Sequence, residues 1–472
     1  MERKSAWEKY SEDELAKLNA FAEEYRQFIS ANKIEREFAA ASIEAAEAAG
    51  YKPLTEAIAK GRKLKAGDKI WASARGKAII LVQIGTAPLT DGFAILGAHI
   101  DSPRLDVKQN PLYEAGKMAY LDTHYYGGIK AYQWVTLPMA IHGVVALKDG
   151  GVVDVRLGDE PGDPVFCVTD LLIHLAAEQV EKAGKKVVEH EDLDVLCGNR
   201  PLILGEGAEG KEADEAKKSP VKAFALKLLA EKYGIVEEDF LSAELEVVPA
   251  GEARDLGFDR SMIIGYGQDD HVCAYPSLIA QLDVAGKKLA RTAVCVLVDK
   301  EEIGSVGATG MASQFFENTM REVMALAGYE GEVALYRALG ASVMLSSDVS
   351  AGLDPLYAGA FEEKNACYMG YGLVFNKFTG SKGKSGSNDA RAEYVAKIRK
   401  CMDDAGVTFQ LAELGKVNQG GGGTIAYLPA KYGMDVIDSG VPVLSMHAPW
   451  EVTSKVDIYE AYKGYRAFLE TI

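Results

Sequence analysis

The sequence predicts an α/β protein: a mixed, largely parallel sheet covered by helices, with a β-rich segment inserted into it. Short, continuous apolar runs bounded by glycine and polar residues recur along the chain, which is the pattern of strands buried on both faces. Stretches with helical spacing of apolar residues lie between several of these runs. The middle of the chain lacks this alternation and instead shows hairpin and loop patterns, which predict the insertion.

The predicted elements follow one another in an order that fits this class. Residues 12–50 carry Ala, Glu and Leu at helical spacing and predict two helices joined near residues 30–32. Strands are expected at residues 77–84, 92–98, 292–298, 342–345 and 441–444. Further helices are expected over residues 310–327 and 388–405.

The inserted segment is expected to comprise residues 107–255, so that residues 1–106 and 256–472 form the α/β body. Within the insertion, residues 139–157 predict a hairpin around an Asp-Gly turn. A helix is expected at about residues 168–183, and the charged stretch 206–218 is expected to be a solvated loop.

Length and composition exclude several classes of protein. A chain of 472 residues is too long for a peptide hormone or a lone binding module, since domains have about 100–200 residues. The net charge of −17 repels nucleic acids and anionic membranes. Six scattered cysteines without a C-x-x-C pair indicate neither a disulfide framework nor a thiolate zinc site, and they fit a reducing cytoplasm. We expect no signal peptide and no membrane span.

Acidic residues and histidines gather where the predicted strands end, and open α/β sheets build their sites at the carboxyl ends of strands. One further acidic pair, Asp269 and Asp270, opens a helical pattern. The side chains at the strand ends are His99 with Asp101, Asp299 with Glu301 and Glu302, Asp348, and His447.

Two imidazoles with several carboxylates suit zinc, manganese or cobalt, and their number is enough for two ions that share one bridging acid. Paired ions activate water and polarise a carbonyl, which is the chemistry of amide hydrolysis. Of the adjacent Glu301 and Glu302, one can bind metal while the other serves as general base. In the His99-x-Asp101 pair, the carboxylate is placed to orient the histidine.

At these residues the sequence resembles the aspartyl aminopeptidase and vacuolar aminopeptidase I family of co-catalytic zinc metallopeptidases, and the likeness covers nearly the whole chain. The segments similar to the family's motifs are residues 97–105, 126–129, 268–270, 299–305, 347–348 and 446–447. The resemblance implies five metal ligands, namely His99, Asp269, Glu302, Asp348 and His447. It also implies that Asp269 bridges the two ions and that Glu301 is the general base.

The resemblance further implies an architecture and a substrate. The family has a catalytic α/β domain interrupted by a β-rich insertion that mediates dimer contacts, and its dimers assemble into a tetrahedral dodecamer. It releases the N-terminal residue from small or unfolded peptides. An insertion-domain histidine of the family enters the active site of a neighbouring subunit, which makes His174 a candidate for this role.

The chain departs from the family pattern at positions that concern specificity. Ala351 and Asp354 stand where family members carry histidines. Residues 420–424 replace a Cys-Gly-Thr-Thr segment of the family, and Trp450 stands near a position where an arginine is common in the family. The resemblance therefore predicts the metal chemistry and leaves open whether the preferred N-terminal residue is acidic, basic or neutral.

Two other functions fit parts of the pattern. One is a related two-metal amide hydrolase, such as a dipeptidase or deacylase. The other is a non-catalytic scaffold that assembles into a shell, which would need neither the general base nor the five ligands. The reading that accounts for all these residues is a cytoplasmic two-metal aminopeptidase.

Overall fold

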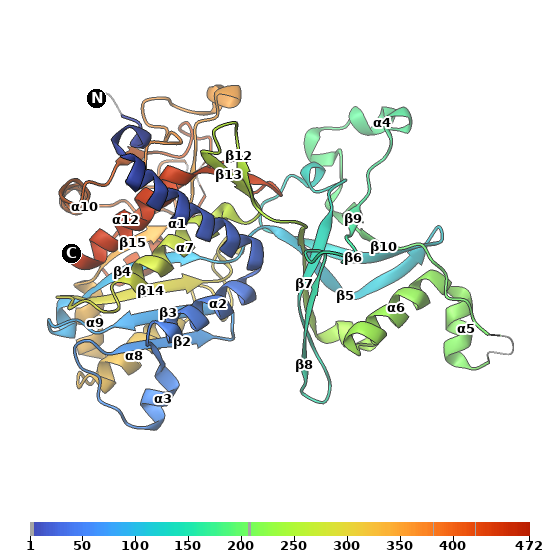
Figure 1. Cartoon of the computed structure of the whole chain (residues 1–472), viewed down its shortest axis with the longest axis horizontal. Helices are drawn as coiled ribbons and strands as arrows, with labels where there is room; N and C mark the ends of the chain where they lie inside the picture. Colours follow the sequence, from blue (N-terminus) through green and yellow to red (C-terminus); the bar gives the residue numbers. More distant parts are fainter. Residues whose placement is uncertain (1–3, 206–208, 381, 421) are drawn as a thin grey trace. The chain divides into compact units, whose positions relative to one another are not determined.

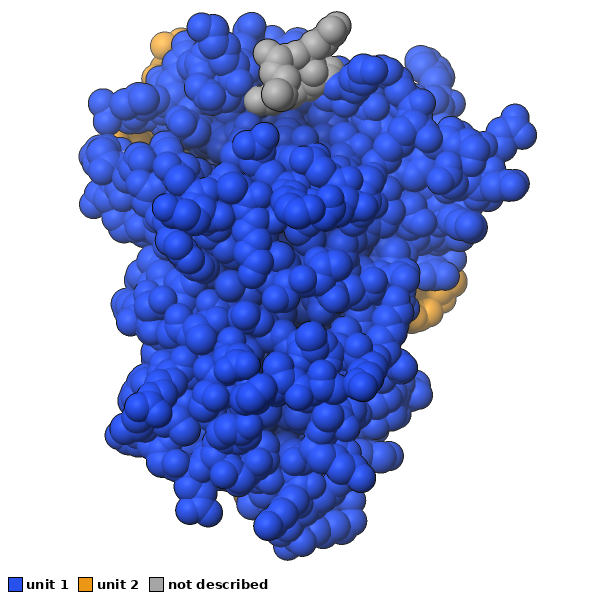
Figure 2. Space-filling view, turned by 90° about the vertical axis from the view of Figure 1, so that its left-hand side faces the viewer, with its two compact units in different colours: residues 1–102, 253–446, 451–472 blue, residues 103–252, 447–450 orange. Residues whose placement is uncertain are grey.

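The computed structural model describes residues 4–205, 209–380, 382–420 and 422–472, and the chain divides into two compact units. Unit 1 comprises Met1–Ser102, Ala253–Met446 and Glu451–Ile472, and unit 2 comprises Pro103–Glu252 and His447–Trp450. Figure 2 colours the two units separately. The expected insertion of residues 107–255 thus differs from unit 2 by a few residues at each end. Residues 447–450, which the sequence analysis assigned to the α/β body, group with unit 2.

A nine-stranded sheet forms the centre of unit 1 (Figure 1). Its strands, in spatial order, are β1 (Lys52–Pro53), β2 (Lys69–Ala74), β3 (Ala78–Gln83), β14 (Thr292–Val298), β4 (Phe93–His99), β15 (Val343–Ser347), β19 (Asp435–Gly440), β17 (Leu373–Asn376) and β18 (Phe409–Ala412). The central strands β14, β4, β15 and β19 run parallel, whereas β3 and β17 are antiparallel to them. The predicted mixed, largely parallel sheet is confirmed.

Helices cover both faces of this sheet. They are α1 (Glu12–Ala31), α2 (Glu35–Ala48), α3 (Leu54–Ala59), α7 (Gln268–Asp283), α8 (Phe315–Leu326), α9 (Glu332–Gly340), α10 (Ala392–Asp404), α11 (Tyr427–Ala430) and α12 (Lys455–Thr471). Every residue of β4 is buried. On one face of the sheet, Leu96 belongs to an apolar cluster with residues of α1, α2, α7 and α12. On the other face, Ile95 belongs to a cluster with residues of α8 and α9. Burial on both faces is why the strand reads as a continuous apolar run.

The helix pair at the start of the chain is confirmed as predicted. The first helix, α1, begins with a capping box, in which the Ser11 hydroxyl accepts from the backbone N–H of Glu14 and the Glu14 carboxylate accepts from the backbone N–H of Ser11. This reciprocal pair satisfies two N–H groups that a helix start leaves without an internal partner.

A smaller five-stranded sheet also belongs to unit 1. Its order is β12 (Arg254–Leu256), β13 (Met262–Gly265), β21 (Glu451–Ser454), β20 (Pro442–Leu444) and β16 (Ser350–Ala351). The strand expected at residues 441–444 is therefore β20 of this second sheet. The large sheet instead takes β19, the strand just before it, which was not predicted because four of its six residues are polar or glycine.

Unit 2 contains a seven-stranded sheet. Its order is β8 (Val152–Leu157), β7 (Met139–Ala146), β11 (Ala243–Pro249), β5 (Arg104–Ala115), β6 (Met118–Tyr126), β10 (Val195–Gly198) and β9 (Cys167–Val168). Strands β7 and β8 pair antiparallel, which confirms the predicted hairpin. The helices of this unit are α4 (Ala177–Val180), α5 (Lys211–Lys218) and α6 (Pro220–Tyr233).

Two expectations in unit 2 were wrong. In place of a helix over 168–183, the chain forms a 3-10 turn at Ile173–Leu175 and the single turn α4, and most of the large apolar side chains of this segment are exposed. A short helix is marginal when its apolar face packs on nothing. The charged stretch 206–218, which was expected to be a loop, contains the helix α5. Lys217 and Lys218 in its last turn favour the helix because positive charges there interact well with the helix dipole. Residues 206–208 lie outside the described ranges.

Every helix within the described ranges is too short or too polar to cross a lipid bilayer.

Candidate metal centre

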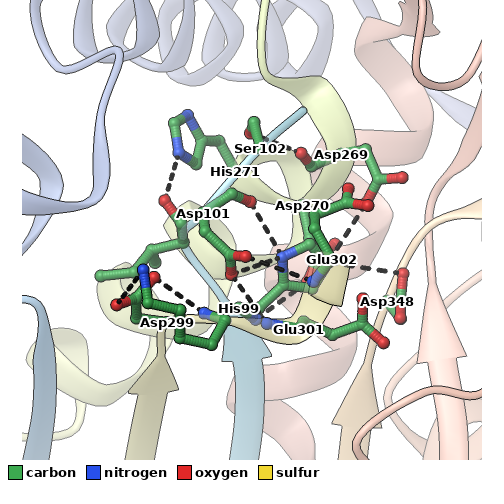
Figure 3. A network of polar contacts seen from close by, with 12 residues as sticks. His99, Asp101, Ser102, Asp269, Asp270, His271, Asp299, Glu301, Glu302 and Asp348 are labelled. Carbon is green, nitrogen blue, oxygen red and sulfur yellow. Dashed lines mark hydrogen bonds and ion pairs between the residues drawn. The ribbon is translucent and has the colours of Figure 1, made fainter. Parts of the chain in front are cut away.

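Three adjacent parallel strands end at one edge of the large sheet, and each delivers acidic or imidazole side chains there. Strand β4 ends with His99, β15 is followed by Asp348, and β14 leads into the short 3-10 turn η8 (Glu301–Ile303). These strands are neighbours in the order β14, β4, β15, so their carboxyl ends lie side by side. Figure 3 shows that their side chains converge in one cluster.

The start of α7 adds two more carboxylates to this cluster. Asp269 and Asp270 are the second and third residues of the element but have non-helical dihedral angles, and the peptide bond between them is cis. The Ser102 hydroxyl donates to the Asp269 carbonyl oxygen over 2.6 Å. Glu451 of β21 accepts from the Asp269 backbone N–H over 3.1 Å. The backbone of Asp269 is thus held from two sides.

The ligand atoms of the cluster lie close together and are largely buried. The Nε2 atom of His99 is 3.2 Å from Oδ1 of Asp269 and 3.8 Å from Oδ1 of Asp348. Three groups of residues offer ligand atoms that all lie within 4.8 Å of one another: His99, Asp269 and Glu302; His99, Glu301 and Asp348; and Asp269, Asp270 and Asp348. Asp270 belongs to the acidic pair seen in the sequence, but no role was predicted for it.

Asp101 occupies a central position in this network. The Nδ1 atom of His99 is 3.0 Å from the backbone carbonyl oxygen of Asp101 and 3.4 Å from its carboxylate. The same carboxylate accepts from the backbone N–H groups of Glu301 and Glu302, over 3.1 and 3.2 Å. Asp101 therefore links the histidine at the end of β4 to the glutamate turn after β14.

Burial and mutual repulsion perturb the acids of the cluster. Burial, followed by the charge of Asp348, raises the pKa of Glu301 to about 8. Burial also raises the pKa of Asp270 well above its usual range. For His99, burial by itself lowers the pKa, but hydrogen bonds with Asp101, Asp269 and Asp348 raise it well above the ordinary value. Such a concentration of negative groups favours bound cations or protons.

A buried polar chain from α1 supports the start of α7. The Tyr25 hydroxyl donates to Oε1 of Gln268 over 2.7 Å, and Nε2 of Gln268 donates to the carbonyl oxygens of Ile263 and Glu451. Neither Tyr25 nor Glu451 was predicted from the sequence, because no local pattern marks a residue whose partner lies 243 or 182 positions away.

Six residues with predicted roles lie in this network, namely His99, Asp101, Asp269, Glu301, Glu302 and Asp348. Two others belong to unit 2. His447 is within 2.7 Å, through Nδ1, of the Gly128 carbonyl oxygen, and His174 is exposed in the 3-10 turn Ile173–Leu175 rather than on the apolar face of a helix. The roles of both histidines stay predictions.

Comparison with known proteins gives one consistent family. Residues 28–469 match the family described as aminopeptidase I zinc metalloprotease (M18). A probable M18 family aminopeptidase 1 of Clostridium acetobutylicum is 56% identical over 99% of this chain and 98% of its own length. The crystal structure of an M18 aminopeptidase from Thermotoga maritima has 40% identity and a TM-score of 0.92, with full coverage of both chains. A structure of the mApe1 dodecamer from yeast shares the fold, with 17% identity, 96% coverage of each chain and a TM-score of 0.75.

Proposed function

The chain belongs to the M18 family of zinc metalloproteases and is a zinc-dependent aminopeptidase, and we propose that it holds two divalent ions in the cluster at the end of the large sheet. Zinc is the expected metal, with manganese or cobalt as alternatives. The proposed ligands are His99, Asp269 and Asp348 for one ion, and Asp269, Glu302 and His447 for the other.

The chemistry of the donor set supports this proposal. An imidazole nitrogen and carboxylate oxygens within 4.8 Å of one another suit zinc, and buried carboxylates at this separation repel one another strongly without a cation. If His447 donates from Nδ1 to the Gly128 carbonyl oxygen, its lone pair resides on Nε2, the nitrogen that a metal would use.

Glu301 is the proposed general base. When bound, the two ions would polarise the scissile carbonyl and lower the pKa of a water molecule. Glu301 accepts the proton of the attacking water and returns it to the leaving amine. The Glu301 carboxylate lies within 4.8 Å of the ligand atoms of His99 and Asp348, so a proton acceptor stands beside the proposed metal ligands.

The substrates we propose are small peptides with a free N-terminus. The family membership supports an aminopeptidase, and the observation that carries the mechanism is the position of Glu301 beside His99 and Asp348. The test is hydrolysis of peptides that begin with Asp, Glu, Lys, Leu or Ala, each with a free and a blocked N-terminus, after metal removal and addition of zinc, manganese or cobalt.

The variant Glu301→Gln should lower kcat by about two to four decades while zinc binding is retained, because only proton transfer is removed. The matched control is Glu393→Gln, which alters an exposed glutamate of α10. Unchanged activity of Glu301→Gln would refute the assignment. Hydrolysis of the blocked peptides alone would favour a deacylase, and no hydrolysis of any peptide by the zinc-bound protein would favour the scaffold.

We also propose assembly into a dodecamer built from dimers, with unit 2 as the dimerisation domain and with a cytoplasmic location. The dodecamer of the yeast relative with the same fold supports the assembly. Exposed apolar side chains in unit 2, such as Leu172, Ile173 and Leu175, support contacts between subunits. His174 lies among them, which supports its proposed role in a neighbouring subunit's site. The free thiols of the cysteines fit a reducing compartment.

A further inference from the structure

The turn that carries Glu301 and Glu302 has an unfavourable backbone conformation. Lys300, directly before it, has a φ of 72°, and Ser305, shortly after it, has a φ of 59°. Residues with a Cβ atom rarely adopt this left-handed region, because the Cβ atom comes too close to the following carbonyl oxygen. Contacts from the rest of the chain must therefore hold the turn in this shape.

Three consecutive backbone N–H groups of this segment donate to two buried carboxylates. Asp101 accepts from Glu301 and Glu302, while Oδ1 of Asp299 accepts from Lys300 over 2.8 Å. Figure 3 shows Asp101 and Asp299 near the same turn. Hydrogen bonds from N–H groups to an ionised carboxylate are among the stronger ones in proteins, so these two side chains restrain the backbone that carries the general base.

Asp299 is in turn held by Thr309. Asp299 is completely buried, and Thr309 is 5% exposed. The Thr309 hydroxyl donates to Oδ2 of Asp299 over 2.6 Å, and the backbone N–H of Asp299 donates to the Thr309 carbonyl oxygen over 3.2 Å. The loop of residues 299–309 is thereby closed at its base by a side-chain and a backbone hydrogen bond.

We propose that Thr309 and Asp299 are positioning residues for the reaction: the Thr309 hydroxyl fixes the Asp299 carboxylate, which holds Lys300 in its left-handed conformation and so orients Glu301. This inference rests on the proposed role of Glu301 as general base. Neither residue belongs to the three groups of close ligand atoms, so the expected defect is in turnover rather than in metal binding.

The test compares Thr309→Val, which removes the hydroxyl and keeps the shape of the side chain, with Thr309→Ser, which keeps the hydroxyl. We expect Thr309→Val to lower kcat about tenfold or more with KM changed less than about twofold, because a small displacement of a catalytic group costs rate rather than affinity. The zinc content should equal that of the wild type. Amide hydrogen exchange of residues 300–303, measured on the metal-free protein, should become faster. Thr309→Ser should restore both turnover and exchange protection.

An unchanged kcat in Thr309→Val would overturn the inference, as would equal losses in the Val and Ser variants or a loss that follows reduced zinc content. If Thr309→Val does not fold, Asp299→Asn replaces it with the same expected results. Glu301→Gln is measured in parallel: full activity of that variant would refute the proposed general base, whereas an inactive Glu301→Gln beside a fully active Thr309→Val would refute only the positioning role.

Discussion

Removal of the metal should make the stability of this protein fall as the pH rises from 5 to 8. The pKa of Glu301 is about 8 in the folded metal-free protein and 4.5 in its ordinary state, because burial disfavours the charged form. Between these values the folded protein retains a proton that the unfolded chain has lost. The stabilisation is therefore complete below pH 4.5 and is lost as the pH rises through 8.

The magnitude follows from the shift. A difference of 8 − 4.5 = 3.5 pH units, at about 1.36 kcal/mol each, corresponds to about 5 kcal/mol for this one carboxyl group. His99 acts in the same direction, because its pKa is also raised and its proton is also lost as the pH rises. Bound zinc takes the place of these protons, so the zinc-bound protein should show a much weaker dependence on pH.

The assay is urea denaturation of the metal-free wild type and of Glu301→Gln at pH 5, 6, 7 and 8, with zinc-loaded samples in parallel. Burial also raises the pKa of Asp438 to about 7 and of Asp457 to about 8, but both groups are present in both proteins and cancel in the difference. The wild type should lose up to about 1.4 kcal/mol more per pH unit than the variant. Parallel curves for the two proteins, or a metal-free wild type that gains stability with pH, would refute the reasoning.

Two further predictions concern the orienting carboxylate and the assembly. Asp101→Asn should weaken zinc binding by about 10–100-fold, because Asp101 contacts His99 and accepts from the Glu302 backbone N–H. Competition with a chelator measures the zinc affinity, and Asp403→Asn, which alters an exposed aspartate, is the control. Equal zinc affinities of the wild type and Asp101→Asn would contradict the prediction. Light scattering should give a particle of twelve subunits of 50.8 kDa each. Ile173→Asp, which places a charge among the exposed apolar side chains of unit 2, should shift the particle to smaller species. A wild type that stays monomeric would contradict the proposed assembly.

Local sequence patterns were sufficient for much of the fold. The strands β3, β4, β14 and β15 were predicted because every residue in them is buried, which produces a continuous apolar run that needs no knowledge of its neighbours. The polar residues that follow β4, β14 and β15 were predicted to meet because parallel strands end at one edge of a sheet. Both inferences depend only on neighbouring positions in the chain.

Tertiary structure decided the features whose partners are distant. The strand at residues 441–444 joined a second sheet through pairing with β16 and β21. The expected helix at 168–183 is replaced by short turns in which most of the large apolar side chains are exposed, so little packing stabilises a longer helix. Tyr25 and Glu451 support Gln268 and Asp269 across 243 and 182 positions.

The sequence by itself thus predicted which acidic and imidazole side chains follow the central strands of the sheet, since residue type and position after a buried strand are local properties. The tertiary structure decided how those residues are held. The Asp101 carboxylate meets the backbone N–H groups of Glu301 and Glu302 only when β4 pairs with β14 in the observed register, and no local pattern encodes that register.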